Sequence, residues 1–259
     1  MNVFYDSVSG YLYLAGHFYG GVTFDTFYFQ TQLHDIIIAK YTLDGKCVWA
    51  KQYGGAGSDL CHALTVDGTG NIYICGKNYE TIDFGPDIVE KGGFIAKFNP
   101  EGSCIWAKKK FPFEVIIQGG LYMTGIAVSD STMLLSGDLN YREVFAIDTI
   151  TINHPEYGSC FILFLNMDGT AIKVKEGLAK NAGVRDGLAI DIMGDIFQAG
   201  YYKDSIIFDT TCLTALSSKM EMFLVKYDNN GVLQWARQAG ADMTGDLFSV
   251  YADHDGNIS

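Results

Sequence analysis

Proline is scarce in this chain: only 4 of its 259 residues are proline. A strand within a sheet loses a hydrogen bond wherever proline replaces an N–H donor, so few prolines suit a chain built mostly of paired strands. Basic residues are also few, because 18 Lys and Arg stand against 30 Asp and Glu and leave a formal charge of −12. Such an acidic chain is a poor electrostatic match for nucleic acid or anionic lipid, so we expect no nucleic-acid partner.

Long apolar runs and a basic N-terminal region are missing as well. The longest uncharged stretch with substantial apolar content, residues 115–129, is interrupted by a glutamine and three glycines. It is shorter than the about 20 residues that a transmembrane helix needs, so we expect no membrane span. Residues 2–6 contain no Lys or Arg, so no signal peptide is recognisable there.

Glycine, in contrast, is plentiful at 30 residues, and two series of glycines recur at a similar interval. The first series closes short apolar segments at Gly16, Gly76, Gly137 and Gly200, which follow one another at nearly equal steps. The second lies in polar turns at Gly45, Gly102, Gly169 and Gly231, and its steps are closely similar to those of the first. Two independent series of the same spacing indicate an internal repeat of about 60 residues.

The tryptophans follow the same repeat. All three, Trp49, Trp106 and Trp235, come four residues after a glycine of the second series, and Lys173 takes this position in the third repeat. Five residues before those glycines come Lys40, Lys97, Phe164 and Lys226. The third repeat therefore departs from the pattern at both positions.

Each repeat reads as four short strands. In the second repeat the expected strands cover residues 60–67, 72–76, 93–98 and 104–108, with a small extended piece at 82–84. Turns rich in Asp, Asn and Gly separate them, and such turns favour hairpins because Gly and Asn accept positive φ. Since no long segment shows a helical period, the sequence predicts an all-β protein.

A repeat of four antiparallel strands favours a β-propeller over a β-solenoid, whose coils are usually much shorter than the interval found here. Several expected strands are apolar almost throughout, as in residues 36–39, 94–96 and 161–165. Strands read this way when both faces of their sheet are covered, as in a propeller, where each blade is covered by its two neighbours. We predict a propeller of four-stranded blades.

The second repeat also resembles a known family. Its segments Gly70–Gly76, Gly93–Gly102 and Ile105–Lys108 look like the SBBP-type bacterial β-propeller repeat. The resemblance extends over nearly the whole chain and is weaker in the third repeat, where Phe164 and Lys173 replace Lys and Trp. It implies a propeller, usually in exported or cell-surface proteins, and it implies no catalytic residue set.

The repeats set the expected domain organisation. We expect blades at about 3–53, 59–110, 123–176 and 185–238, with the start of a fifth repeat at 246–259. This predicts a fragment of a longer propeller or an open array of about four blades. Alternatively, the last segment pairs with the first blade and closes a four-bladed ring.

The cysteines show no metal-binding spacing such as C-x-x-C. They are Cys47, Cys61, Cys75, Cys104, Cys160 and Cys212. Cys47 and Cys104 occupy the same repeat position, which favours buried free thiols that pack as small hydrophobes. Cys61 and Cys75 flank one hairpin, so a cross-strand disulfide there is an alternative, provided that its geometry is met.

One turn is a weak calcium candidate. Asp253, Asp255 and Asn257 have the D-x-D-G-N arrangement, whose oxygens suit Ca²⁺. The cognate turns at 67–71 and 191–195 lack the middle carboxylate. We therefore favour hairpin turns stabilised by Asx hydrogen bonds at all three places, and expect no cofactor.

Catalytic motifs are weak. The five histidines form no H-x-x-x-H or H-E-x-x-H arrangement, and the glycine-rich segments at 54–57 and 119–120 precede strands rather than helices. Asp59, Asp186 and Asp246 come just before the expected innermost strands, near one mouth of the central channel. They are the candidates for an active centre if the protein is an enzyme.

Aromatic residues fall into two groups. Those that recur in the repeat are expected to pack between blades. The non-repeated ones in the long connections are better candidates for binding: Phe18, Tyr19, Phe27, Tyr28, Phe29, Tyr79, Tyr141, Tyr201 and Tyr202.

These observations favour a non-enzymatic scaffold of an exported bacterial protein, located at the cell surface, outside the cell or in the periplasm. We expect it to bind a protein or glycan through its loops. The alternatives are a propeller hydrolase or lyase with acidic residues at the channel mouth, and a purely structural spacer.

Overall fold

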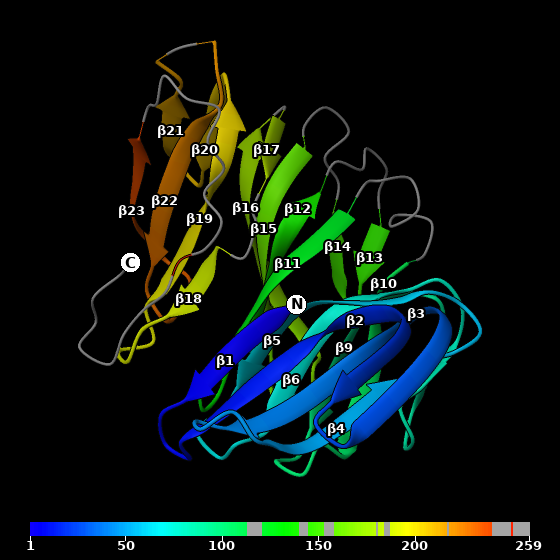
Figure 1. Cartoon of the computed structure of the whole chain (residues 1–259). Helices are drawn as coiled ribbons and strands as arrows, with labels where there is room; N and C mark the ends of the chain where they lie inside the picture. Colours follow the sequence, from blue (N-terminus) through cyan, green and yellow to red (C-terminus); the bar gives the residue numbers. More distant parts are fainter. Residues whose placement is uncertain are drawn as a thin grey trace. The chain divides into compact units, whose positions relative to one another are not determined.

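The protein is all-β. A computed structural model describes residues 1–112, 121–139, 145–152, 158–179, 181–183, 187–216, 218–239 and 250, and every regular element in these ranges is a β-strand (Figure 1). Within them, no helix is long and apolar enough to cross a membrane, and none of the sheets closes on itself. The predicted fold class, an open or partial propeller, is therefore confirmed. The chain forms two compact units, Met1–Ile117 and Gln118–Ser259, which are described one after the other.

The first sheet, drawn in blue in Figure 1, contains four antiparallel strands in chain order. They are β1 (Asn2–Asp6), β2 (Tyr11–Phe24), β3 (Phe27–Thr42) and β4 (Cys47–Tyr53). The pairing of β2 with β3 shifts register between Tyr19 and Gly20 and then continues to a tip at Asp25. The aromatic residues at 18–19 and 27–29 therefore lie on strands, whereas the sequence analysis placed them in a connection.

The second sheet repeats this order. Its strands are β5 (Asp59–Val66), β6 (Ile72–Asn78), β9 (Gly92–Phe98) and β10 (Cys104–Phe111). A small hairpin of β7 (Ile82–Asp83) and β8 (Ile88–Val89) lies in the connection between β6 and β9. The four strands predicted for this repeat are confirmed, with small differences at their ends.

The third sheet belongs to the second unit. Its strands are β11 (Leu121–Val128), β12 (Met133–Leu139), β15 (Gly158–Leu165) and β16 (Ala171–Ala179), and the hairpin β13 (Phe145–Ile147) and β14 (Ile150–Ile152) forms separately.

The fourth sheet contains β17 (Asn181–Gly183), β18 (Leu188–Ile190), β19 (Ile196–Lys203), β22 (Glu221–Tyr227) and β23 (Leu233–Ala239). Both β17 and β18 pair with β19, so two short strands occupy the place of a single first strand. Its hairpin, β20 (Ser205–Phe208) and β21 (Thr211–Thr214), joins the third sheet through β16 and makes that sheet six-stranded.

The small hairpins fill the space between neighbouring sheets. In the first unit, Ile82, Phe84 and Val89 pack into one core with Tyr13 and Ile36 of the first sheet. In the second unit, Ile206 and Phe208 pack in the same way against Cys160 and Ile162 of the third sheet. In both units the hairpin therefore contributes apolar area to the contact with the preceding sheet, and burying this area stabilises the pair.

The tryptophan position makes the second recurring contact. Trp49 of β4 donates its indole N–H to the Pro100 carbonyl at 3.3 Å, and a Cβ at Gly102 would lie 2.8 Å from the Trp49 ring. In the second unit, Lys173 of β16 donates to the Asn230 carbonyl. A Cβ at Gly231 would lie 2.8 Å from the Phe164 ring. This repeat position thus packs on the last turn of the following sheet.

The third repeat departs from the pattern by exchanging two residues across paired strands. Lys40 faces Trp49 in the first sheet, and the lysine and tryptophan of the second and fourth sheets face each other likewise. In the third sheet Phe164 faces Lys173, with the ammonium 4.3 Å from the ring centre. The cross-strand pair therefore keeps one aromatic ring and one cation, with their strands swapped.

Candidate functional site

The polar turns have a structural role wherever they are described. The Asp67 carboxylate accepts hydrogen bonds from the backbone N–H groups of Thr69 and Asn71, at 3.0 and 2.9 Å, and from the Tyr73 hydroxyl at 2.9 Å. Burial raises the pKa of Asp67, but these bonds, with those from the Asn71 and Thr69 side chains, outweigh it and hold the pKa below its usual value. The oxygens are thus engaged in an Asx turn.

The calcium candidate itself, Asp253, Asp255 and Asn257, lies outside the described residues. Among the residues that are described, no group of three or more His, Cys, Asp or Glu side chains is placed to hold a metal ion. The cognate turn at Asp191 is again an Asx turn, since its carboxylate accepts the N–H groups of Met193 and Asp195, both at 2.9 Å.

Of the three aspartates considered for an active centre, Asp186 and Asp246 lie outside the described ranges. Asp59 has no exposed surface. One carboxylate oxygen accepts the Gly55 N–H at 2.7 Å, and the other is buried without a hydrogen-bond partner. Burial, with a smaller contribution from the charge of Asp35, raises the pKa of Asp59 to about 7. The Asp59 carboxyl group is therefore closed to solvent in this structure, and its one hydrogen bond holds the backbone at Gly55.

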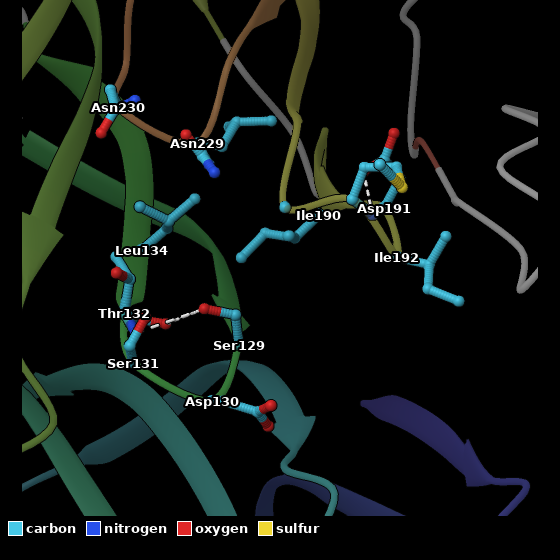
Figure 2. A pocket seen from close by; sticks show the side chains of 13 residues that line it. Ser129, Asp130, Ser131, Thr132, Leu134, Ile190, Asp191, Ile192, Asn229 and Asn230 are labelled. Atoms are coloured by element: carbon cyan, nitrogen blue, oxygen red, sulfur yellow. Dashed lines mark hydrogen bonds between the residues drawn. The ribbon is translucent and has the colours of Figure 1, made fainter.

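A pocket of about 430 Å³ lies between the turns of the third and fourth sheets, within the second unit (Figure 2). Three turns form it: residues 129–132 between β11 and β12, residues 190–194 between β18 and β19, and residues 229–230 between β22 and β23. These turns are far apart in the sequence. They meet because each joins two strands at the same end of its sheet.

The pocket combines polar groups with apolar side chains. Hydroxyl groups of Ser129 and Thr132, carboxylates of Asp130 and Asp191, and amides of Asn229 and Asn230 line it, and none of the described residues lining it is Lys or Arg. Ile192 and Met193 are 69% and 75% exposed beside it. The lining contains carboxylates, and no cation among its described residues balances them, so an anionic ligand is disfavoured. A ligand with neutral or cationic groups that form hydrogen bonds suits the pocket.

The turns that carry these groups are held by hydrogen bonds of their own. The Ser129 hydroxyl accepts the Thr132 N–H at 3.2 Å (Figure 2). Asp228 accepts the N–H groups of Asn230 and Val232, at 2.9 and 2.8 Å. The pocket is therefore built on turns that are already ordered. This reduces the conformational entropy that the protein loses when a ligand binds.

The sequence analysis did not find this pocket. The sequence analysis interpreted residues 191–195 as a hairpin turn stabilised by Asx hydrogen bonds. The tip of this turn carries Ile192 and Met193, where the cognate turn has Gly68 and Thr69. Two apolar residues at the tip of an exposed turn were the available signal.

The predicted binding aromatics differ in exposure. Tyr19, Tyr28 and Tyr79 are 68%, 62% and 36% exposed and remain candidates. Tyr202 is fully buried and donates its hydroxyl to Gln238 at 2.9 Å, so the prediction is wrong for this residue. Tyr141 lies outside the described residues.

None of the six cysteines forms a disulfide, so the alternative disulfide between Cys61 and Cys75 is absent. The predicted burial is confirmed for Cys47, Cys61, Cys75 and Cys160. It is wrong for Cys212, which lies exposed on the hairpin strand β21, and Cys104 is half-buried.

Comparison with known proteins supports the repeat. No curated protein matches the chain. Residues 48–77, from β4 of the first sheet into β6 of the second, match the family model of the SBBP β-propeller repeat. This segment includes Trp49, the buried Asp59, the Asx turn of Asp67 and the closing Gly76. Residues 48–77 are thus similar to the SBBP β-propeller repeat.

Proposed function

We propose that this chain is a non-enzymatic propeller scaffold of an exported or cell-surface bacterial protein, and that it binds a protein ligand at the pocket between the turns of its third and fourth sheets. The SBBP repeat supports the scaffold role and is compatible with an extracellular location. The scaffold supplies rigid turns, and recognition commonly depends on loops held in this way.

The observation that carries the proposal is the exposed pair Ile192 and Met193 beside the polar pocket. Apolar anchors surrounded by groups that form hydrogen bonds are typical of protein interfaces, in which Met is enriched. A glycan is the second candidate, because hydroxyl, amide and carboxylate groups make up much of the lining.

Panning of a random peptide library against the whole chain, together with a glycan array, tests the proposal. We expect selected peptides to bind, and the double variant Ile192→Ser/Met193→Ser to weaken binding at least tenfold, because about 1.4 kcal/mol of lost contact corresponds to a factor of ten. The matched control is Val8→Ser, which removes a 77% exposed apolar residue from a turn of the first sheet, and should bind as the wild type does.

The remaining outcomes separate the alternatives. Glycan binding that Asn229→Ala reduces would identify a glycan ligand instead. Peptide binding that is equal in the double variant and the wild type would exclude this pocket, and the absence of any binding would favour a structural spacer. Fractionation of the source cells tests the proposed location.

A further inference from the structure

Two histidines of the first unit lie diagonally across the paired strands β2 and β3, far in sequence from the pocket: His17 pairs with Ile36, and His34 pairs with Tyr19. His17 lies on β2 and His34 on β3, with ring centres 5.6 Å apart and an angle of 71° between the ring planes. The Tyr19 ring packs against His34, with ring centres 5.8 Å apart. His17 is exposed and His34 is half-buried, so small ions reach both rings from solvent.

The same nitrogen of each ring is engaged by the start of the second sheet. His17 Nδ1 lies 3.3 Å from the Cys61 carbonyl oxygen, and His34 Nδ1 lies 3.5 Å from the Ser58 hydroxyl. A hydrogen bond from the His17 Nδ1–H to this carbonyl leaves Nε2 of His17 with its lone pair, whereas the Ser58 hydroxyl is able to pair with either tautomer of His34. Metal-ligating histidines characteristically show this second contact.

We propose that His17 and His34 form a bidentate site for a late first-row divalent metal ion, such as Cu²⁺, Ni²⁺ or Zn²⁺, with water completing the coordination. Ring centres at this distance let one nitrogen of each imidazole approach the ~2.8–3.3 Å separation of two neighbouring ligands on a tetragonal or tetrahedral ion with metal–N distances of about 2.0–2.1 Å. Imidazole nitrogen suits these ions better than it suits Ca²⁺ or Mg²⁺.

The surroundings of the two histidines partly favour and partly oppose the binding of a metal ion. Burial, and to a smaller extent the neighbouring charges of His34 and Lys77, lower the pKa of His17. The neutral form, which binds metal, is thereby favoured at neutral pH. The Lys77 ammonium, 5.4 Å from the centre of the Tyr79 ring, disfavours a second cation nearby. The site therefore suits ions that bind imidazole strongly, and Cu²⁺ leads that order.

Copper titration of the whole chain tests the proposal. The charge of the Met1 α-amino group also lowers the pKa of His17. The amine is therefore acetylated before the titration, which removes this charge. We expect one Cu²⁺ per chain with two nitrogen ligands in the electron paramagnetic resonance spectrum, and a melting temperature that rises on adding Cu²⁺, since an ion that binds only the folded state stabilises it.

His17→Gln and His34→Gln should each weaken Cu²⁺ binding at least tenfold, whereas the matched control His62→Gln, on the neighbouring strand β5, should bind as the wild type does. Circular dichroism without metal establishes that the variants fold. Wild-type Cu²⁺ binding without a two-nitrogen signature, or equal binding by His17→Gln and the wild type, would overturn the proposal. Retention of peptide binding at the pocket by both variants keeps this test independent of the proposed function.

Discussion

Two aspartates of the second repeat show how their surroundings change the properties of one residue type. Asp67 accepts several hydrogen bonds, which hold its pKa down against burial. Asp59 accepts one from the backbone and leaves its second oxygen buried without a partner. Burial then dominates and raises the pKa of Asp59 to about 7. The first carboxylate stabilises its turn in the charged form, whereas the second is better tolerated with a proton.

Asp59 should therefore make stability fall as pH rises. An unfolded aspartate has a pKa of about 3.9, so the folded chain retains a proton that the unfolded chain has lost between about pH 4 and pH 7. We expect Asp59→Asn to be more stable than the wild type by about 1–3 kcal/mol at pH 8, and this advantage to shrink toward pH 4. Urea unfolding across this pH range measures the difference.

Asp67→Asn is the control of opposite sign. Because the pKa of Asp67 is lowered, its carboxylate contributes stability above about pH 4 that is lost as the pH falls through the folded pKa. The variant should therefore be less stable than the wild type at pH 8. A difference between Asp59→Asn and the wild type that stays constant with pH would contradict the assignment of Asp59.

At the scale of elements, the last turns of the second and fourth sheets act as contact surfaces for the preceding sheet of the same unit. Gly102 and Gly45 occupy the same turn position, with φ of +74° and +85°. A Cβ at Gly102 would lie 2.8 Å from the Trp49 ring, whereas a Cβ at Gly45 would meet nothing within 4 Å. The two glycines share a backbone requirement and differ in their neighbour.

Substitution of both glycines separates these effects. Gly45→Ala should destabilise the protein by about 1 kcal/mol, the cost of a left-handed backbone for a residue with Cβ. Gly102→Ala should destabilise the protein by about 1–3 kcal/mol more than Gly45→Ala does, because its methyl group overlaps the indole ring. Chemical denaturation measures both losses. In a Trp49→Ala background the two substitutions should cost the same, and a persistent excess at Gly102 would contradict the contact.

Hairpin tips are a second feature of this scale, and the tips of the β2–β3 and β13–β14 hairpins share a chemistry. Asp25 and Asp148 have φ of 51° and 53°. Each accepts a backbone N–H from the start of the last strand of its own repeat, from Cys47 at 2.6 Å and from Ala171 at 2.7 Å. The sequence carries the signal as Asp-Thr pairs at 25–26, 148–149 and 209–210. The sequence analysis did not use it, because the period of these pairs becomes meaningful only once the hairpins are seen.

At the scale of the whole molecule, each unit contains a core shared by two sheets. In the first unit, Tyr13, Ala15, Ile36 and Ile38 of the first sheet pack against residues of the second. A repeat of this kind does not bury its apolar faces alone, so its stability depends on its neighbour.

We therefore expect residues 1–117 to fold as an isolated fragment, with the far-ultraviolet circular dichroism of β-structure and a cooperative thermal transition. Residues 1–56, the first sheet alone, should remain unfolded or aggregate, because the face of Ile36 and Ile38 loses its partner. A cooperative transition for the shorter fragment, or none for the longer one, would contradict the shared core.

Most of the fold followed from local features. The spacing of Gly16 from Gly76, and of Gly45 from Gly102, predicted the repeat, and the Asx turn at Asp67 predicted the hairpin that the structure contains. The cross-strand exchange of Phe164 and Lys173 looked like a loss of the pattern, because a sequence comparison treats the two positions separately. Because the two residues pair across the sheet, one exchange accounts for both departures from the pattern.

The sequence by itself determined an all-β chain with an internal repeat of about 60 residues, because turn chemistry and the alternation of short strands depend on φ preferences and hydrogen bonds within a few residues. Only the tertiary structure decided the pocket at Ile192, the burial of Asp59 and the approach of His17 to His34. Each of these joins groups from different strands or turns. Their distances depend on strand register and sheet packing, which the order of residues does not display.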